Sequence, residues 1–110
     1  MTALAREHCE ACDGSTPVAS DEDVARLRGD LSEDWSVADG ERLHRSLRFK
    51  DFSAAFAMAT RVALLAEAEG HHPEMTVGWG HLDIELTTHA AGGLTRNDFI
   101  LAARIDALLS

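Results

Sequence analysis

The sequence predicts an α+β domain in which three helices pack on one face of a four-stranded antiparallel sheet. Two strand pairs are each joined at a glycine-containing turn, one at Asp39-Gly40 and one near Gly78–Gly80. Helical patterns lie before, between and after these two pairs. Because two hairpins separated by a helix can place the helices together on one side of an antiparallel sheet, this order of elements favours that fold class.

The first part of the domain is predicted to contain a short helix and a hairpin. Ser20 can cap a helix in "SDEDVARLRGDLSEDW", whose acidic first turn interacts favourably with the helix dipole and whose apolar stripe is Val24, Leu27 and Leu31. The dipeptide Asp39-Gly40 is a strong hairpin signal. After it, Leu43, Leu47 and Phe49 alternate with polar residues, which is typical of a strand with one solvent-facing side.

The longest helix is predicted between the two hairpins, in "DFSAAFAMATRVALLAEAEG". Its predicted apolar stripe consists of Phe52, Phe56, Ala59, Ala63 and Ala66. Gly70 fits the position that follows a helix, and Pro73 disfavours helical geometry at His72. The helix is therefore expected to end just before two adjacent histidines.

Two further strands and a final helix complete the domain. The stretches "TVGW" and "HLDIELTTH" are predicted strands, and apolar residues alternate in the second from Leu82 to Leu86. Thr95 and Asp98 then have the spacing of a capping box, with Asp in place of Glu. A helix is therefore predicted from this point onward.

Length and composition fit one globular domain. The chain has 110 residues, of which 45% are hydrophobic and 26% are charged. Residues 1–20 are predicted to be a flexible N-terminal extension, because Gly14, Ser15 and Pro17 interrupt regular structure there. Residues 21–110 are predicted to be the folded domain.

The charge and hydropathy patterns exclude several classes of partner. The formal net charge is -9, from 10 basic and 19 acidic side chains, and it repels phosphate backbones, so no nucleic acid partner is expected. No apolar run approaches the ~20 residues that a membrane span needs, so no membrane is expected either. Because the first residues lack the apolar stretch of a signal peptide, a cytoplasmic location is expected.

The motif "HCEAC" places Cys9 and Cys12 at CxxC spacing, which fits a metal or redox site in a cytosolic protein. A zinc site needs four ligands, and His8 supplies only a third nearby. A thioredoxin-like motif follows a strand, and no strand is predicted before this one. Two reduced thiols on the extension are therefore the expected state.

Three histidines lie where they can meet. His71 and His72 follow the end of a helix, and His89 ends a strand on its polar side. A helix end and a strand end can converge on one rim of a sheet. Imidazoles titrate near neutral pH, so such a cluster can give and take protons. The alternative is a structural one, in which a histidine only caps the last carbonyl groups of the helix.

A metal site is a further alternative for this region. Its possible ligands are His71, His72 and His89, with Glu67 or Asp98. Neighbouring side chains in an extended chain point apart, which disfavours a shared ion between the paired histidines. No HExxH motif and no cysteine lies in the predicted domain, so no metal is expected.

The stretch "EAEGHHPEMTVGWGHLDIELTTHAAGGLTRND" resembles the signature of the pterin-4a-carbinolamine dehydratase family. The matching positions are Glu67, His71, His72, Pro73, Trp79, His89 and Asp98. They are spread over the whole stretch at the spacings of that signature. The order of elements from about Asp21 to Leu109 also agrees with the family.

The resemblance implies a specific activity. The family dehydrates 4a-hydroxytetrahydrobiopterin, the carbinolamine formed when aromatic amino acid hydroxylases use their pterin, to quinonoid dihydropterin. It implies no metal or organic cofactor, a small-molecule pterin substrate, and assembly as a homodimer or homotetramer. It also implies a functional link to an aromatic amino acid hydroxylase.

The family's site residues map onto this chain one by one. By resemblance the catalytic residues are His71, His72 and His89, with His71 and His89 as the acid/base pair and His72 orienting the pterin. The substrate-binding residues are expected to be Glu67, Trp79, Thr88 and Asp98.

Alternatives remain for several of these residues and for the activity itself. Glu67 could accept a hydrogen bond from His71 or from the pterin, and Asp98 could orient a histidine or only cap the last helix. Trp79 could equally be a core residue. Relatives of this fold also serve as dimerisation partners of a transcription factor or as assembly factors, so a non-catalytic partner role is the alternative function.

Overall fold

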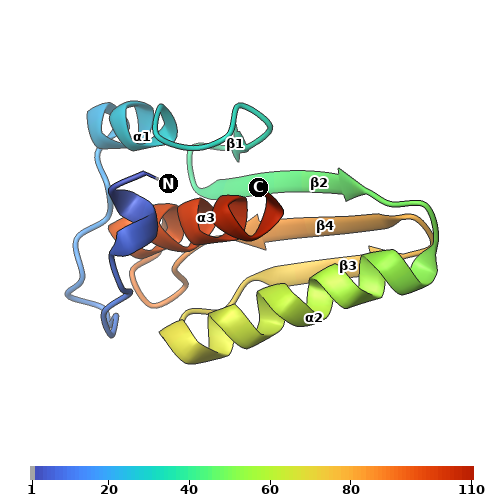
Figure 1. Cartoon of the computed structure of the whole chain (residues 1–110). Coiled ribbons are helices and arrows are strands. Elements are labelled where there is room, and N and C mark those ends of the chain that lie inside the picture. Colours follow the sequence, from blue (N-terminus) through green and yellow to red (C-terminus); the bar gives the residue numbers. More distant parts are fainter. Residues whose placement is uncertain (1) are drawn as a thin grey trace.

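The predicted elements are present in the predicted order (Figure 1). The structure is a computed structural model that describes residues 2–110. The helices are η1 (Leu4–Arg6), α1 (Asp21–Arg28), α2 (Phe52–Glu69) and α3 (Arg96–Leu109). The strands are β1 (Ser36–Ala38), β2 (Arg42–Arg48), β3 (Glu74–Gly78) and β4 (His81–Leu86). The predicted α+β class is confirmed. Within residues 2–110 no helix combines the length and the apolar character that crossing a membrane requires.

The four strands form one antiparallel sheet in the order β1-β2-β4-β3. Glu74 at the start of β3 lies opposite Glu85 near the end of β4, and Gly78 lies opposite His81 at the connecting turn. The segment before β3 and the segment after β4 therefore meet at one end of the sheet. The turn between the two strands lies at the other end.

The tight turn between β1 and β2 was correctly predicted from Asp39-Gly40. Asp39 has φ 56° and Gly40 has φ 69°, and the Glu41 N–H donates to the Ala38 carbonyl at 3.0 Å. Positive φ at both central residues defines a type I′ turn, whose twist matches that of the flanking strands.

The core lies between the sheet and helices α2 and α3, which Figure 1 shows in front of it. Helix α2 buries the small side chains Ala55, Ala59, Val62 and Ala66. The predicted stripe was wrong at Phe52, Phe56 and Ala63, which are all exposed, Phe52 to 47% and Phe56 to 54%. Small residues at the contact allow α2 to approach the sheet closely, and the two stacked phenylalanine rings lie on the adjacent, solvent-facing stripe.

Part of the segment that was predicted to be an extension, residues 1–20, packs against α3. Leu4 and Ala5 are 2% and 6% exposed and belong to the core. Arg104 of α3 donates to the Ala5 and Glu7 carbonyls at 3.0 and 2.9 Å, and Figure 1 shows η1 beside α3. The physical reason is that these apolar residues cover a part of α3 that would otherwise be exposed.

A polar network absent from the sequence predictions ties α3 to β2. Arg45 projects to the covered face of the sheet, where its Nη1 lies 2.5 Å from the Asp106 carboxylate. The same carboxylate accepts from Trp35 Nε1 at 2.7 Å and from the Ser32 backbone N–H at 2.8 Å. Because one carboxylate satisfies three donors, the loop before β1, the sheet and the end of α3 are fixed together.

We expect Asp106→Ala to lower the free energy of unfolding by about 3 kcal/mol, because Arg45 and Trp35 Nε1 lose their shared acceptor in a largely buried place. Urea unfolding followed by circular dichroism measures the change. Asp34→Ala is the matched control, since Asp34 also contacts Arg45, at 3.5 Å, but is largely exposed. Its loss should be below about 1 kcal/mol. Equal losses in the two variants would contradict this account.

Candidate active site

The backbone that carries the paired histidines is fixed by the end of α2. Gly70 has φ 66° and ψ 24°, a left-handed conformation that suits glycine. Its N–H donates to the Glu67 carbonyl at 3.3 Å, and the His71 N–H donates to the Ala66 carbonyl at 3.2 Å. These two bonds form a Schellman motif, which ends the helix and sets the position of His71.

Asp98 lies at the centre of the site. Its carboxylate is fully buried, and Oδ1 accepts from His71 Nε2 at 2.6 Å. Oδ2 accepts from Thr88 Oγ1 at 2.7 Å and from the Thr95 backbone N–H at 2.9 Å. Of the two roles considered for Asp98, the structure therefore shows both, because one oxygen orients a histidine and the other completes the predicted capping box.

The contact with Asp98 determines which nitrogen of the His71 ring carries the proton. A carboxylate oxygen accepts, so Nε2 of His71 carries the proton and Nδ1 is the nitrogen left for other partners. His71 is only 9% exposed, and its Nδ1 forms no hydrogen bond within residues 2–110. This nitrogen is not fully buried, so it remains accessible. A carboxylate behind one imidazole nitrogen fixes the tautomer and the orientation of the ring.

His72 lies on the outside of the same helix end. Its side chain is exposed, and its Nε2 lies 3.4 Å from Oε1 of Glu67. Glu67 was considered as a partner of His71, but the structure places it beside His72, because Asp98 already occupies the inner ring. The Glu67–His72 contact is long and solvated, so it orients the ring only weakly.

His89 reaches the same end of the sheet from β4. It follows Thr88, which pairs with Gly93 across a short turn, and its side chain is exposed. Because Thr88 donates to Asp98, the residue next to His89 is held against the His71–Asp98 pair. The three histidines therefore come from two segments that are joined through one buried carboxylate.

Trp79 does not join this group within the chain. It lies in the turn between Gly78 and His81, at the opposite end of β3 from His72, and is 73% exposed. It is therefore neither a core residue nor a neighbour of the three histidines in one chain. In residues 2–110, no three histidine, cysteine or acidic side chains are arranged to hold a metal ion.

Two polar residues beside the site were not identified from the sequence. Glu69 and Asn97 directly precede the Gly70-His71 corner and Asp98, and both hold the N-terminal segment. Their only signal in the sequence is that adjacency. A cavity of about 680 Å³ between this segment, α1 and the start of α3 is lined by Asn97 but by none of the three histidines.

Together these features define an α+β protein in which a carboxylate-held imidazole and two exposed histidines lie at one end of the sheet. The chain belongs to the family described as pterin 4 alpha carbinolamine dehydratase, whose model matches residues 17–108. The match includes every histidine of the site and Asp98. The resemblance inferred from the signature is therefore confirmed at the level of the family.

Curated relatives agree with this assignment over nearly their full length. A protein of Chlorobium limicola is 47% identical and one of Rubrobacter xylanophilus is 41% identical, each with 98% of this chain covered. The alignments cover 97% and 100% of those proteins. Both carry the provisional name pterin-4-alpha-carbinolamine dehydratase.

Two solved structures are similar to this chain. A protein of Brucella melitensis described as a transcriptional coactivator/pterin dehydratase is 32% identical, with a TM-score of 0.78 and coverage of 86% of this chain and all of that one. A pterin dehydratase-like protein described as a RuBisCO assembly factor in the alpha-carboxysome is 26% identical, with a TM-score of 0.58. That alignment covers 69% of this chain and 89% of the other.

We expect Asp98→Asn to lower the free energy of unfolding by about 2 kcal/mol, because an amide cannot accept from His71, Thr88 and Thr95 at once and turns an NH2 group toward a donor. Urea unfolding at neutral pH measures the loss. Glu67→Gln makes the same chemical change at an exposed position and should stay within about 0.5 kcal/mol of the wild type. An Asp98→Asn variant as stable as the wild type would contradict the described network.

Proposed function

We propose that this chain is a hydro-lyase that dehydrates 4a-hydroxytetrahydrobiopterin to quinonoid dihydropterin by histidine acid/base catalysis. The observation that carries the proposal is the His71–Asp98 pair, at 2.6 Å, at the sheet end where His72 and His89 are also found. Membership in the dehydratase family supplies the substrate class. The proposed cycle needs no cofactor.

The reaction requires two proton transfers that an imidazole pair can perform. The 4a-hydroxyl accepts a proton and leaves as water, while the N5 proton of the pterin is removed as the C4a–N5 double bond forms. One proton is given and one is taken, so the number of protons on the protein is unchanged, and the two histidines regain their starting states once a proton is exchanged between them or with solvent. Groups that titrate near neutrality perform both steps at physiological pH.

We assign the transfers to His71 and His89. Asp98 holds Nε2 of His71 and leaves Nδ1 to face the substrate, and Thr88 positions the turn that carries His89. His72, exposed beside Glu67, is proposed to orient the heterocycle. Trp79 has no part in the site of a single chain, because it lies at the far end of the sheet.

In a cell, this activity would consume the carbinolamine released by an aromatic amino acid hydroxylase and would supply a reductase with quinonoid dihydropterin. The rival proposal is a non-catalytic partner role. It is favoured by the solved relative described as a RuBisCO assembly factor. The complete histidine set, with His71 held by the buried Asp98 carboxylate, supports the enzyme instead.

We also propose that the chain forms a homodimer or homotetramer. Phe52, Phe56 and Leu64 on α2 are among its most exposed large apolar residues, at 47%, 54% and 68%. The two phenylalanine rings stack with centroids 5.9 Å apart. Such a stripe beside the buried face of a helix is suited to packing against the same stripe of a second copy.

The carbinolamine, generated in situ, should decay to quinonoid dihydropterin faster with the wild-type chain than in buffer. His71→Ala and His89→Ala should each reduce the catalysed rate by about 10²- to 10⁴-fold, because each removes a proton-transfer group. His81→Ala is the matched control, since His81 lies at the opposite end of β4, and it should retain the wild-type rate. A chelator should change nothing.

No acceleration by the wild-type chain would refute the dehydratase proposal and favour the partner role. Equal loss in His81→Ala and His89→Ala would refute the placement of the site at this end of the sheet.

Phe56→Glu should shift the chain to a smaller assembly, because a charge in an apolar contact between copies is costly to bury. Size-exclusion chromatography with light scattering measures the mass. Ala25→Glu adds the same charge to the exposed surface of α1 and should leave the mass unchanged. An unchanged mass for Phe56→Glu would contradict this interface.

A further inference from the structure

Residues 7–12, here called the strap, cross the back of the site. Glu69, the last residue of α2, has an almost fully buried carboxylate that accepts from the Cys9 backbone N–H at 2.8 Å. The other oxygen of the same carboxylate lies 2.9 Å from Nδ1 of His8. The strap is therefore fixed to α2 two residues before His71.

The strap is also fixed to the start of α3 through Asn97. The Asn97 side chain accepts from the Glu10 N–H at 3.0 Å and donates to the Glu10 carbonyl at 2.5 Å. The same amide donates to Cys12 Sγ at 3.0 Å, and the Cys9 thiol donates to the Asn97 carbonyl at 3.6 Å. Both cysteines of the CxxC motif therefore contact the residue that immediately precedes Asp98.

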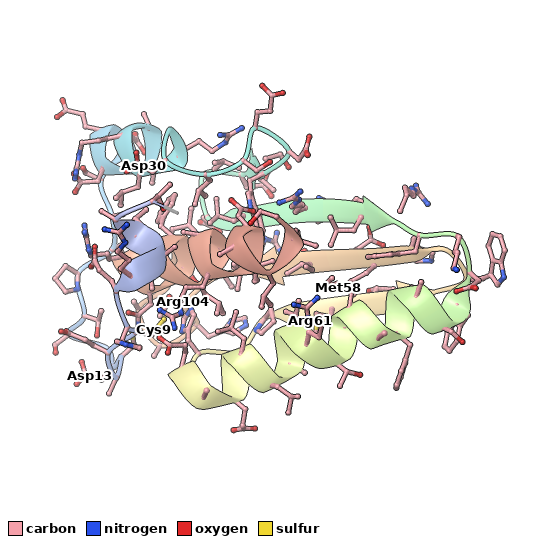
Figure 2. All side chains as sticks on the ribbon, viewed as in Figure 1. Cys9, Asp13, Asp30, Met58, Arg61 and Arg104 are labelled. Atoms are coloured by element: carbon pink, nitrogen blue, oxygen red, sulfur yellow. The ribbon has the colours of Figure 1, made fainter. Side chains whose placement is uncertain are left out.

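Charged side chains of α3 reinforce this contact. Glu7 forms a two-point ion pair with Arg96, at 2.9 and 2.6 Å. Arg104 donates to the Glu7 carbonyl at 2.9 Å and lies 3.9 Å from Glu69. Figure 2 shows Cys9 and Arg104 between α3 and the C-terminal end of α2.

We propose that the strap is a positioning device for the active site, with Glu69 and Asn97 as positioning residues for the His71–Asp98 pair. It joins the two backbone segments that carry this pair, and so adds to the pair itself and to the 3.9 Å contact of Arg104 with Glu69. This proposal concerns the same site as the proposed dehydratase function. Its kcat and KM measurements rest on that function.

The strap can matter for catalysis because the hydrogen bond between His71 and Asp98 is short and depends on the relative position of two helix ends. His71 and Asp98 meet at 2.6 Å from the end of one helix and the start of another. Helix ends are the parts of helices that fray most readily, and a shift of about 1 Å in a catalytic group can cost 10²-fold in rate. Tying Glu69 and Asn97 to one short segment limits that shift.

The Cys9 thiol provides a direct probe of the docked strap. Burial, followed by the nearby Glu69 charge, raises the pKa of Cys9 to about 12. Because alkylation requires the thiolate, Cys9 should react slowly with iodoacetamide at pH 8 while the strap is docked. The rate should rise when the strap detaches, since the thiol then regains an ordinary pKa.

The test compares full-length Glu69→Ala, Glu69→Gln and Asn97→Ala with the wild type. Three quantities are measured: Cys9 alkylation, located by fragment mass spectrometry; the ¹⁵N signals of the His71 ring; and kcat and KM for the carbinolamine. Glu10→Gln is the matched control, because Glu10 lies on the strap but contacts Asn97 only through its backbone. Urea unfolding establishes that each variant is folded.

We expect Glu69→Ala and Asn97→Ala to raise Cys9 alkylation by about tenfold or more, as local opening exposes the thiol. In the same variants the His71 ring signals should shift, and kcat should fall by about tenfold with KM within about twofold. Glu69→Gln keeps an acceptor for the Cys9 N–H and should restore most of kcat. Glu10→Gln should match the wild type.

The proposal is overturned if Cys9 becomes reactive while the His71 signals and kcat stay at wild-type values. It is also overturned if neither alanine variant changes Cys9 reactivity, because Glu69 and Asn97 then do not hold the strap. If the wild-type chain shows no turnover, the dehydratase function fails by itself. The link between Cys9 reactivity and the His71 signals still decides the role of the strap.

Discussion

The buried carboxylate of Asp98 is the constraint on which the site depends. An unpaired charge in this place would cost several kcal/mol, so the fold must supply donors to it. They come from three places: His71 after α2, Thr88 after β4, and the Thr95 N–H that opens α3. Satisfying one side chain therefore fixes a helix end, a strand end and a helix start relative to one another.

Features encoded in local sequence were predictable. The type I′ turn follows from Asp39-Gly40, and the end of α2 follows from Gly70, because each needs a backbone conformation that few residues adopt. The capping box of Thr95 and Asp98 could be read from spacing alone. The meeting of the histidine-bearing segments followed from the predicted antiparallel pairing of β3 and β4.

Features set by contacts distant in sequence were not predictable in the same way. No local pattern pairs Arg45 with Asp106. The two meet because Arg45 lies on the helix-covered face of β2. The spacing between Glu67 and His71 suggested a pair, but Asp98 competes for the inner ring and leaves Glu67 to His72. The docked N-terminal segment depends on Glu69 and other partners about 60 or more positions away, which no local pattern reveals.

The central claim is that Asp98 holds His71 in one tautomer, with the proton on Nε2 and Nδ1 available to the substrate. It is tested most directly by the ¹⁵N chemical shifts of the His71 ring in the wild-type chain, followed from acid to alkaline pH. The account predicts that neutral His71 carries its proton on Nε2. A ring that carries it on Nδ1, or exchanges freely between the two forms as in a solvated histidine, would contradict the account.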